Sequence, residues 1–433
     1  MRLDIGRFPI RDMAFGKETR YEAGILHIDR NEALDVVMED AHIVSAELHI
    51  VKPGDPVRIV PVKEAIEMRC KIGGTAYPGV TGQLAPAGSG VVHALTGGCV
   101  LAAGKKWGSF QDGLIDMGGP FQRYTIYGSM TNLVLVADTD EEFERHEQQK
   151  RNHAIRWAGH RLAEYVGSCL QNLCPEETDV WELPPLDARG DASDLPGVVY
   201  VLQVQTQMEI PGFNTLYYGW DCNHMIPTLI HPNELLDGAV ISGSFMPCSS
   251  KISSYEHCNN PTVKRLMREH GRTINFLGVI LSNLNVAMDQ KQRSAQVVAS
   301  LSKNIGAVAA IVCEEGYGNP DVDYIQTLVE LERVGIRTVG IANECTGRDG
   351  ASQPLMTLDR AADALVSCGN VSEILHLPPM PTVLGDIHSL ERDGISGGWD
   401  GCVAADGSVT MEDNGIFCGD HVSGFSMKTC VDY

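Results

Sequence analysis

The sequence is short of positive charge. Of its 433 residues, 34 are Lys or Arg and 56 are Asp or Glu, so the formal net charge is -22. The basic residues form no dense cluster along the chain, and an acidic protein repels phosphate backbones and anionic lipid. Nucleic acid and membrane surfaces are therefore not expected as partners.

Long apolar runs and paired cysteines are also missing. No stretch reaches the roughly 18 apolar residues that span a bilayer, and Met1–Gly6 contains no basic region followed by an apolar run. We therefore expect a cytoplasmic protein. The 13 cysteines include no CxxC pair, so neither a zinc ribbon nor a thioredoxin motif is predicted, and most cysteines are expected to be reduced core thiols.

Three common catalytic motifs are absent as well. No GxGxxG opens a helix in the second half, and neither GxSxG nor HExxH occurs. These absences remove the usual sequence support for nicotinamide enzymes, serine esterases and zinc peptidases. We predict no nucleotide cofactor.

The length of 433 residues predicts two or three packed units. Hydrophobic residues make up 43% of the chain, and residues 1–190 are predicted to form a β-rich domain that ends in a surface helix over Glu141–Leu170 and a linker at Leu183–Leu195. His146, His153 and His160 recur every seven residues on that helix. A solvated helix face explains this spacing more simply than a ligand site.

The second half alternates short apolar runs with helical patterns. The runs are Val198–Val204, Asn275–Leu281, Ala307–Cys313, Arg337–Ile341 and Ala364–Ser367, and helices are predicted at Arg293–Lys303 and Tyr324–Val334. Such alternation predicts a doubly wound, mostly parallel sheet in residues 191–433. The fold class is thus α/β.

Ligands of such sheets bind beyond the carboxyl ends of the strands. The loops expected there contain Glu314, Glu315 and Asn319 after the third run, and Arg348 and Asp349 after the fourth. Carboxylates and permissive glycines suit a small cationic substrate, so these five residues are our candidates for substrate binding. Helix capping by the Asn319 region is an equally good explanation of part of the pattern.

One segment is rich in soft ligand types. Cys222, His224, His231, Cys248, His257 and Cys258 fall within it. Their spacing is loose, so scattered core thiols and capping histidines are a better explanation than a metal site. No metal is predicted.

Several runs together bring a family to mind. They are Ile226–Ile230, Asp237–Gly243, His257–Pro261, Glu315–Asp321 and Gly347–Gln353, with Ile59–Lys63, Gly88–Gly90 and His93–Leu95 in the first half. Through these runs the chain resembles, over nearly its whole length, the component B proprotein of the glycine, sarcosine and betaine reductases. Several motifs together are more specific than any one of them.

The resemblance implies a mechanism. In that family the proprotein cuts itself before an internal cysteine, which becomes a pyruvoyl group. The carbonyl condenses with a substrate amine, and a selenol or thiol of a partner component attacks the carbon bearing the nitrogen, which cleaves a C–N bond reductively. The implied partners are a thiol or selenocysteine subunit and a small amine or N-substituted substrate, within a hetero-oligomer.

The chain departs from the family pattern at the cleavage site. After Gly243 the family has an Asn-Cys pair, whereas here Ser244 and Phe245 follow. Phenylalanine cannot perform an N-to-S acyl shift, so a pyruvoyl group cannot form at that position. The nearest thiol is Cys248, which follows Pro247, a poor context for the rearrangement. Ser244 and Cys248 are therefore the candidate catalytic residues.

Three hypotheses follow from this departure. The chain is a reductase-complex subunit that is processed at an unusual residue, or an uncleaved homologue that uses Cys248 or a Cys/His metal site for other C–N or C–S chemistry. The third hypothesis is a non-catalytic scaffold that docks a partner subunit.

Overall fold

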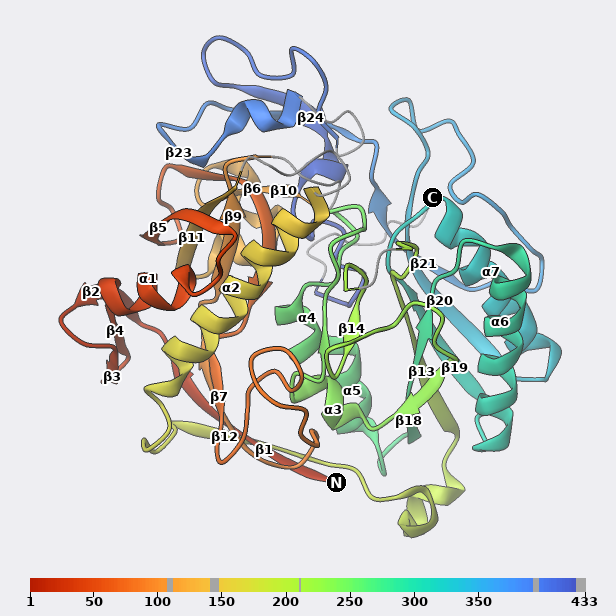
Figure 1. Ribbon diagram of the computed structural model, residues 1–433. Coiled ribbons are helices and arrows are strands. Elements are labelled where there is room, and N and C mark those ends of the chain that lie inside the picture. The colour runs from red at the N-terminus through yellow and green to blue at the C-terminus, as the bar shows by residue number, and fades with distance from the viewer. Residues whose placement is uncertain (107–111, 141–147, 210–211, 392–396, 426–433) are drawn as a thin grey trace.

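The computed structural model describes residues 1–106, 112–140, 148–209, 212–391 and 397–425. Two groups of sheets lie side by side (Figure 1), the N-terminal group in red to yellow on the left and the sheet of the second half in green to cyan on the right. Helices and strands both contribute throughout, so the α/β class is confirmed. Of the described helices, none is long and apolar enough to cross a membrane.

The first half is dominated by strands, as predicted. Its six-stranded sheet has the order β10-β6-β9-β11-β5, with β23 beside β6, and smaller sheets have the orders β12-β1-β8-β7 and β2-β4-β3. The strands are β1 (Arg2–Pro9), β2 (Asp12–Gly16), β3 (Arg20–Glu22), β4 (Ile25–Asp29), β5 (Ile43–Val51), β6 (Val57–Ile66), β7 (Arg69–Lys71), β8 (Gly90–Thr96), β9 (Val100–Gly104), β10 (Gly113–Asp116), β11 (Asn132–Thr139), β12 (Glu177–Glu182) and β23 (Thr382–Gly385). Helix α1 (Arg30–Met38) packs on β5.

Helix α2 (Gln148–Ser168) lies across β9, β6 and β7 and confirms most of the predicted helix, of which residues 141–147 fall outside the described part. Ala154, Ala158, Leu162 and Val166 form a buried apolar stripe on this helix, and Trp157 beside them is partly buried. The last turn also approaches the sheet closely, because a Cβ on Gly167 would lie 2.3 Å from the carbonyl oxygen of Arg69. A side chain at this position would not fit.

The second half contains the predicted doubly wound sheet, in the order β16-β18-β13-β19-β20-β21. Its strands are β13 (Gly197–Val204), β16 (Thr228–Ile230), β18 (Asn275–Asn283), β19 (Ala309–Glu314), β20 (Arg337–Glu344) and β21 (Leu365–Asn370). All pair in parallel except β16, which is antiparallel to β18. Strands β13 and β18 are buried along their whole length, which explains why they read as continuous apolar runs.

The helices of this half cover both faces of the sheet. Helices α6 (Met288–Asn304) and α7 (Asn319–Arg333) lie together on the outer face, whereas α3 (Pro232–Leu236), α4 (Ser254–Cys258) and α5 (Pro261–Glu269) lie between the sheet and the N-terminal half (Figure 1). A short sheet β15-β14-β17 joins them, with β14 (Leu216–Tyr217), β15 (Trp220–Asp221) and β17 (Val240–Ile241). The inner helices therefore form the boundary between the halves.

The C-terminal residues return to the first half. Strand β23 pairs in parallel with β6, and a further pair, β22 (Ile374–Leu377) with β24 (Val409–Glu412), leads to residues 413–425. This segment touches both halves: Phe417 N donates to Leu114 O at 3.1 Å, and Cys313 Sγ donates to Val422 O at 3.0 Å. The predicted division at residue 190 stays a prediction, but the chain beyond it contributes to both halves.

Candidate functional site

The parallel strands of the second sheet follow the spatial order second, first, third, fourth, fifth, which places the topological switch point between β13 and β19. Glu315 follows β19 directly at this point. Its Oε2 accepts the amide of Gln205 at 2.8 Å and its Oε1 accepts that of Ile252 at 2.9 Å. Burial raises the pKa of Glu315 to about 7, even though both amides favour the carboxylate. The group can therefore gain or lose a proton near neutral pH.

Residues 242–253 lie between β17 and α4 and run beside Glu315. A Cβ on Gly243 would lie 2.5 Å from the carbonyl carbon of Asn214, so this glycine lets the two backbones meet. Ser244 N donates to Phe213 O at 2.5 Å, and the Ser244 side chain is fully buried. The stretch that the sequence singled out thus lies inside the molecule, at the boundary of the two halves.

Three charged side chains from distant parts of the chain meet this stretch. Arg156 on α2 donates through Nε to Glu64 Oε2 on β6 at 3.0 Å and through Nη1 to Ser244 Oγ at 2.5 Å. Lys251 Nζ lies 3.3 Å from the same Glu64 oxygen and donates to Gly243 O at 2.9 Å. All three side chains are at most 1% exposed. We call Glu64, Arg156 and Lys251 the buried charge cluster.

Attraction between the charges of the cluster opposes the cost of burying them. Lys251 and Arg156 lower the pKa of Glu64 although burial opposes this, whereas burial lowers the pKa of Lys251 against the attraction of Glu64. Glu64 Oε1 also accepts the amide of Ser254 at 3.0 Å. The Glu64 carboxylate on β6 is therefore bound by Arg156 of α2, by Lys251 of residues 242–253 and by the first amide of α4.

The prediction of a solvated histidine face on α2 was wrong. His160 is fully buried and His153 mostly so, and burial lowers the pKa of each to about 4, while His146 lies outside the described residues. Neutral His160 donates from Nδ1 to Arg156 O at 2.8 Å and accepts the Ser254 hydroxyl at Nε2, 3.2 Å away. His160 therefore lies next to the buried charge cluster, in contact with the backbone of Arg156 and the side chain of Ser254.

Cys248 lies in the apolar core beside Phe417 and Cys418. Its thiol is fully buried and donates to Asn414 O at 2.7 Å. Burial raises its pKa well above the usual range of a thiol. A protonated, buried thiol is a poor nucleophile. Of the two candidate catalytic residues, the geometry therefore favours Ser244, which contacts Arg156, over Cys248.

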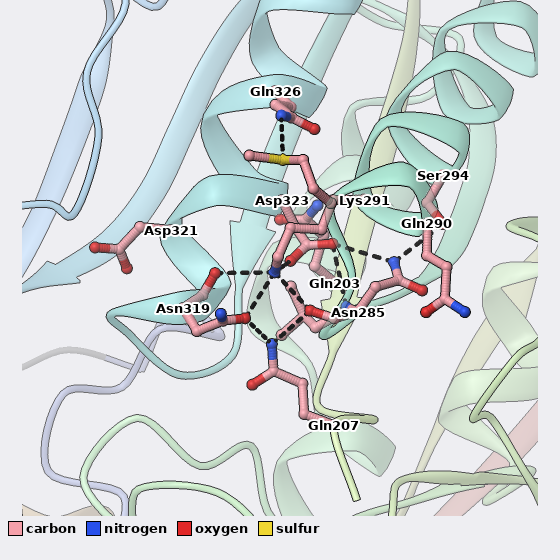
Figure 2. Close-up of polar contacts among 12 residues, drawn as sticks. Gln203, Gln207, Asn285, Gln290, Lys291, Ser294, Asn319, Asp321, Asp323 and Gln326 are labelled. Carbon is pink, nitrogen blue, oxygen red and sulfur yellow. Dashed lines mark hydrogen bonds and ion pairs between the residues drawn. The ribbon is translucent and has the colours of Figure 1, made fainter. Parts of the chain in front are cut away.

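Asn319 is the first residue of α7 and belongs to a polar network around Lys291 (Figure 2). Lys291 Nζ donates to Asn319 Oδ1 at 2.8 Å and to Asn285 O at 2.5 Å, and it pairs with Asp323. Gln207 Nε2 donates to the same Asn319 oxygen at 2.6 Å. Asn319 thus links the ends of β13 and β18 to α7, and its role in substrate binding stays a prediction.

Glu314 ends β19 and points to the other side of the strand from Glu315. Burial and the neighbouring carboxylates of Asp321 and Asp323 raise its pKa well above the usual range. Burial also raises the pKa of Asp321, although the amides of Met356 and Gly318 donate hydrogen bonds to its carboxylate. Asp321 accepts the amide of Gly318 at 2.7 Å, so the predicted capping at the start of α7 is confirmed.

Arg348 and Asp349 lie on the surface, away from Glu315. Arg348 pairs with Glu412 at 2.7 Å and stacks on Trp399 at 4.5 Å, with 56% of its side chain exposed. Asp349 Oδ1 accepts the amide of Ala351 at 3.1 Å within an exposed turn. The structure therefore brings together Glu315 and the Ser244 stretch but not this pair.

The Cys/His segment does not converge on one point. His231 caps α3, His224 is mostly exposed, and Cys258 lies 3.3 Å from Arg69 Nη1. His257 is fully buried, and burial lowers its pKa to about 3. Across the described residues, no three His, Cys, Asp or Glu side chains are grouped so that they could hold a metal ion.

Comparisons with known proteins agree with the motifs. Residues 1–431 match the family model described as glycine/sarcosine/betaine reductase component B subunits. The chain belongs to this family. The component B resemblance of the sequence motifs is thus confirmed, and it spans almost the whole chain.

Three curated component B relatives from Peptoclostridium acidaminophilum are aligned over 100% of both chains. The betaine reductase complex component B subunit alpha is 58% identical over 442 residues. The glycine reductase complex component B subunits alpha and beta are 38% identical over 436 residues, and the sarcosine reductase complex component B subunit alpha is 37% identical over 436. No solved structure matches the chain.

The residues around position 245 do not fit a pyruvoyl group. Phe245 lacks the thiol that would attack the preceding carbonyl. Cys248 follows Pro247, and its thiol is held protonated against Asn414 O. Ser244 Oγ accepts a hydrogen bond from the Arg156 guanidinium. The residues of this component B chain at this place therefore do not support a pyruvoyl group.

Sequence reasoning missed the buried charge cluster. One signal was present for Glu64, because a carboxylate stands within the otherwise apolar run from Ile59 to Ile66, next to Lys63. Charged residues are almost never buried without partners, so such a position predicts an ion pair in the interior. The partners Arg156 and Lys251 had no comparable signal in the sequence.

Proposed function

We propose that this chain is the substrate-binding subunit of a component B-type reductase complex, and that its substrate is a glycine derivative with a quaternary nitrogen, such as glycine betaine. The observation that carries the proposal is Phe245, which stands where the family resemblance leads us to expect the precursor cysteine. The 58% identity with a relative named as a betaine reductase component B subunit supports it.

Quaternary nitrogen makes a carbonyl cofactor unnecessary. A nitrogen with four carbon substituents has neither a hydrogen nor a lone pair, so it cannot condense with a carbonyl to form a Schiff base. Such a nitrogen already carries the positive charge that makes it a leaving group. The reaction of a quaternary substrate therefore does not require a precursor cysteine at position 245. Phe245 would prevent Schiff-base chemistry on a primary or secondary amine.

The reaction in this proposal is a displacement. A thiolate or selenolate of a partner protein attacks the carbon that bears the nitrogen, a C–S or C–Se bond forms, and the C–N bonding pair leaves with nitrogen as a neutral tertiary amine. The chain itself binds and orients the substrate and keeps water away from the reacting carbon. The electrons for the net reduction come from thiols of the partner.

The buried position of the site suits this role. Glu315, Ser244 and the buried charge cluster lie between the two halves with little or no exposed surface. Charges and dipoles held in a dry interior orient a charged ligand more strongly than they would in water. Cys248, with its raised pKa and a backbone carbonyl as its partner, is not assigned a catalytic step.

An intact-mass measurement with borohydride treatment tests the proposal. We expect one chain of 47.0 kDa, and we expect turnover of glycine betaine with the partner proteins to survive borohydride, because no carbonyl is needed. A glycine-type component B, treated in the same way, is the control that should lose activity. Two fragments that meet between Ser244 and Ser250, or turnover of glycine and sarcosine but not of betaine, would overturn the proposal.

A further inference from the structure

Arg156 carries a hydrogen-bond donor without a partner. Its Nε and Nη1 are bound to Glu64 and Ser244, at 3.0 and 2.5 Å. Its Nη2 is buried and has no hydrogen-bond partner among the described residues. A buried donor of a charged group that finds no acceptor is costly, so an acceptor that is not part of the described chain is expected there.

A second cation lies beside Arg156. Arg156 and Lys251 are both within salt-bridge distance of the same oxygen, Glu64 Oε2, at 3.0 and 3.3 Å. The positive charge of Lys251 therefore lies close to the Arg156 guanidinium, on the side of Glu64.

We propose that Arg156, with Lys251 beside it, forms a subsite for the carboxylate of the substrate. The inference rests on the proposed function and deepens it, because it assigns one end of a zwitterionic glycine derivative to named side chains. The ligand class is a short aliphatic carboxylate whose α-carbon bears the nitrogen.

The geometry suits a carboxylate better than another small acceptor. A guanidinium is planar and presents its donors in a fixed fork that matches carboxylate oxygens, and Lys251 adds a point charge next to it. Ser244 holds one arm of the fork, which fixes the direction of the free Nη2. A water molecule could accept one hydrogen bond from Nη2, but a carboxylate is also attracted by the charges of both cations.

The site also has a place for the positive end of such a substrate. Glu315 Oε1 accepts the amide of Ile252, the residue after Lys251, at 2.9 Å, so it borders the same interior region. It lies at the switch point, where ligands of this sheet type bind. A carboxylate on Arg156 and an ammonium group toward Glu315 would hold the carbon between them in one orientation.

Binding of a matched set of ligands to the full-length chain tests the subsite by calorimetry. Glycine betaine and choline share the trimethylammonium group and differ in the carboxylate, whereas acetate has only the carboxylate. We expect betaine to bind, acetate to compete with it, and choline to bind at least about 100-fold more weakly, which is the loss typical of an unpaired buried charge. Equal binding of betaine and choline would overturn the subsite, as would the absence of binding by betaine and acetate.

Variants give a second readout. Arg156→Lys keeps the charge but loses the fork, and we expect it to weaken binding of betaine and acetate by about tenfold or more. Arg58→Lys is the matched control, because Arg58 is also a fully buried arginine with one unpartnered nitrogen, but its Nε and Nη2 bind both oxygens of Asp116 in the N-terminal half. Affinity that changes equally in both variants would overturn the assignment to Arg156.

Failure of the subsite and failure of the proposed function give different results. If betaine and choline bind equally and Arg156→Lys leaves both unchanged, the subsite is wrong while a quaternary ammonium substrate remains supported. If acetate binding depends on Arg156 but betaine binds no more tightly than acetate, the carboxylate subsite is supported and the quaternary ammonium substrate is wrong.

Discussion

Glu315 shows how burial sets the chemistry of single residues in this protein. The sequence predicted a role for it beside Glu314, since both follow one strand. The two carboxyl groups differ because Glu315 accepts two amide hydrogen bonds, whereas Glu314 faces the carboxylates of Asp321 and Asp323. Neighbouring positions of an extended chain point to opposite sides, so their environments diverge.

The pH dependence of stability tests the state of Glu315. Its pKa is raised from 4.5 to about 7 in the folded chain, so the folded state holds a proton there that the unfolded state releases. The contribution of this group to the free energy of unfolding is therefore fully present below about pH 4.5. This contribution, of up to about 3 kcal/mol, is lost as the pH rises through about 7. Chemical denaturation of wild type and Glu315→Gln between these pH values measures the difference.

Other groups titrate in both proteins, so the decisive quantity is the difference between the two curves. We expect the wild type to lose stability relative to Glu315→Gln as the pH rises. Parallel curves would contradict a raised pKa. The exposed Glu209 serves as the control through Glu209→Gln.

Helix α2 positions the chemistry at the scale of elements. Arg156 and His160 stand on its inner side, and Gly167 sets how closely the last turn approaches β7. The apolar stripe was readable from the 3.6-residue period, whereas the buried arginine and histidine were not, because periodicity cannot tell a solvated polar side chain from one that is paired in the interior.

Replacing Gly167 by alanine tests this contact. Its Cβ would lie 2.3 to 2.5 Å from backbone atoms of Arg69, which cannot move aside as a side chain could. We expect Gly167→Ala to destabilise the chain by about 1–3 kcal/mol despite the better helix propensity of alanine. Thermal unfolding measures it, with Ser168→Ala, at the exposed end of the helix, as the control. Unchanged or raised stability would contradict the close packing.

At the scale of the whole molecule, the C-terminal segment connects the halves. Phe417 is fully buried beside Tyr127, and its backbone fills the space next to Gly113, where a Cβ would lie 2.9 Å away. A few residues later Val422 packs into the core of the second sheet beside Cys313. The segment thus packs into both cores around the site, so we expect the halves to unfold together.

Phe417→Ala tests the connection. Removal of a fully buried phenyl ring leaves a cavity, and we expect a loss of about 3–5 kcal/mol with a single unfolding transition. Trp220→Ala is the control, because Trp220 is 74% exposed and its removal should change stability by at most about 0.5 kcal/mol. Denaturant titration, followed by fluorescence and by circular dichroism, measures the transition. If one half kept its stability in Phe417→Ala, the expectation would be contradicted.

The sequence by itself determined the parallel sheet, its order of elements and the family. Strands buried on both faces must be apolar throughout, so β13 and β18 could be read directly, and several motifs together identified component B. Only the tertiary structure decided which polar residues meet. Glu64, Arg156 and Lys251 are separated by about 90 residues or more along the chain, and their pairing follows from how the halves pack, since the cost of burying each charge is met only by partners that the fold brings to it.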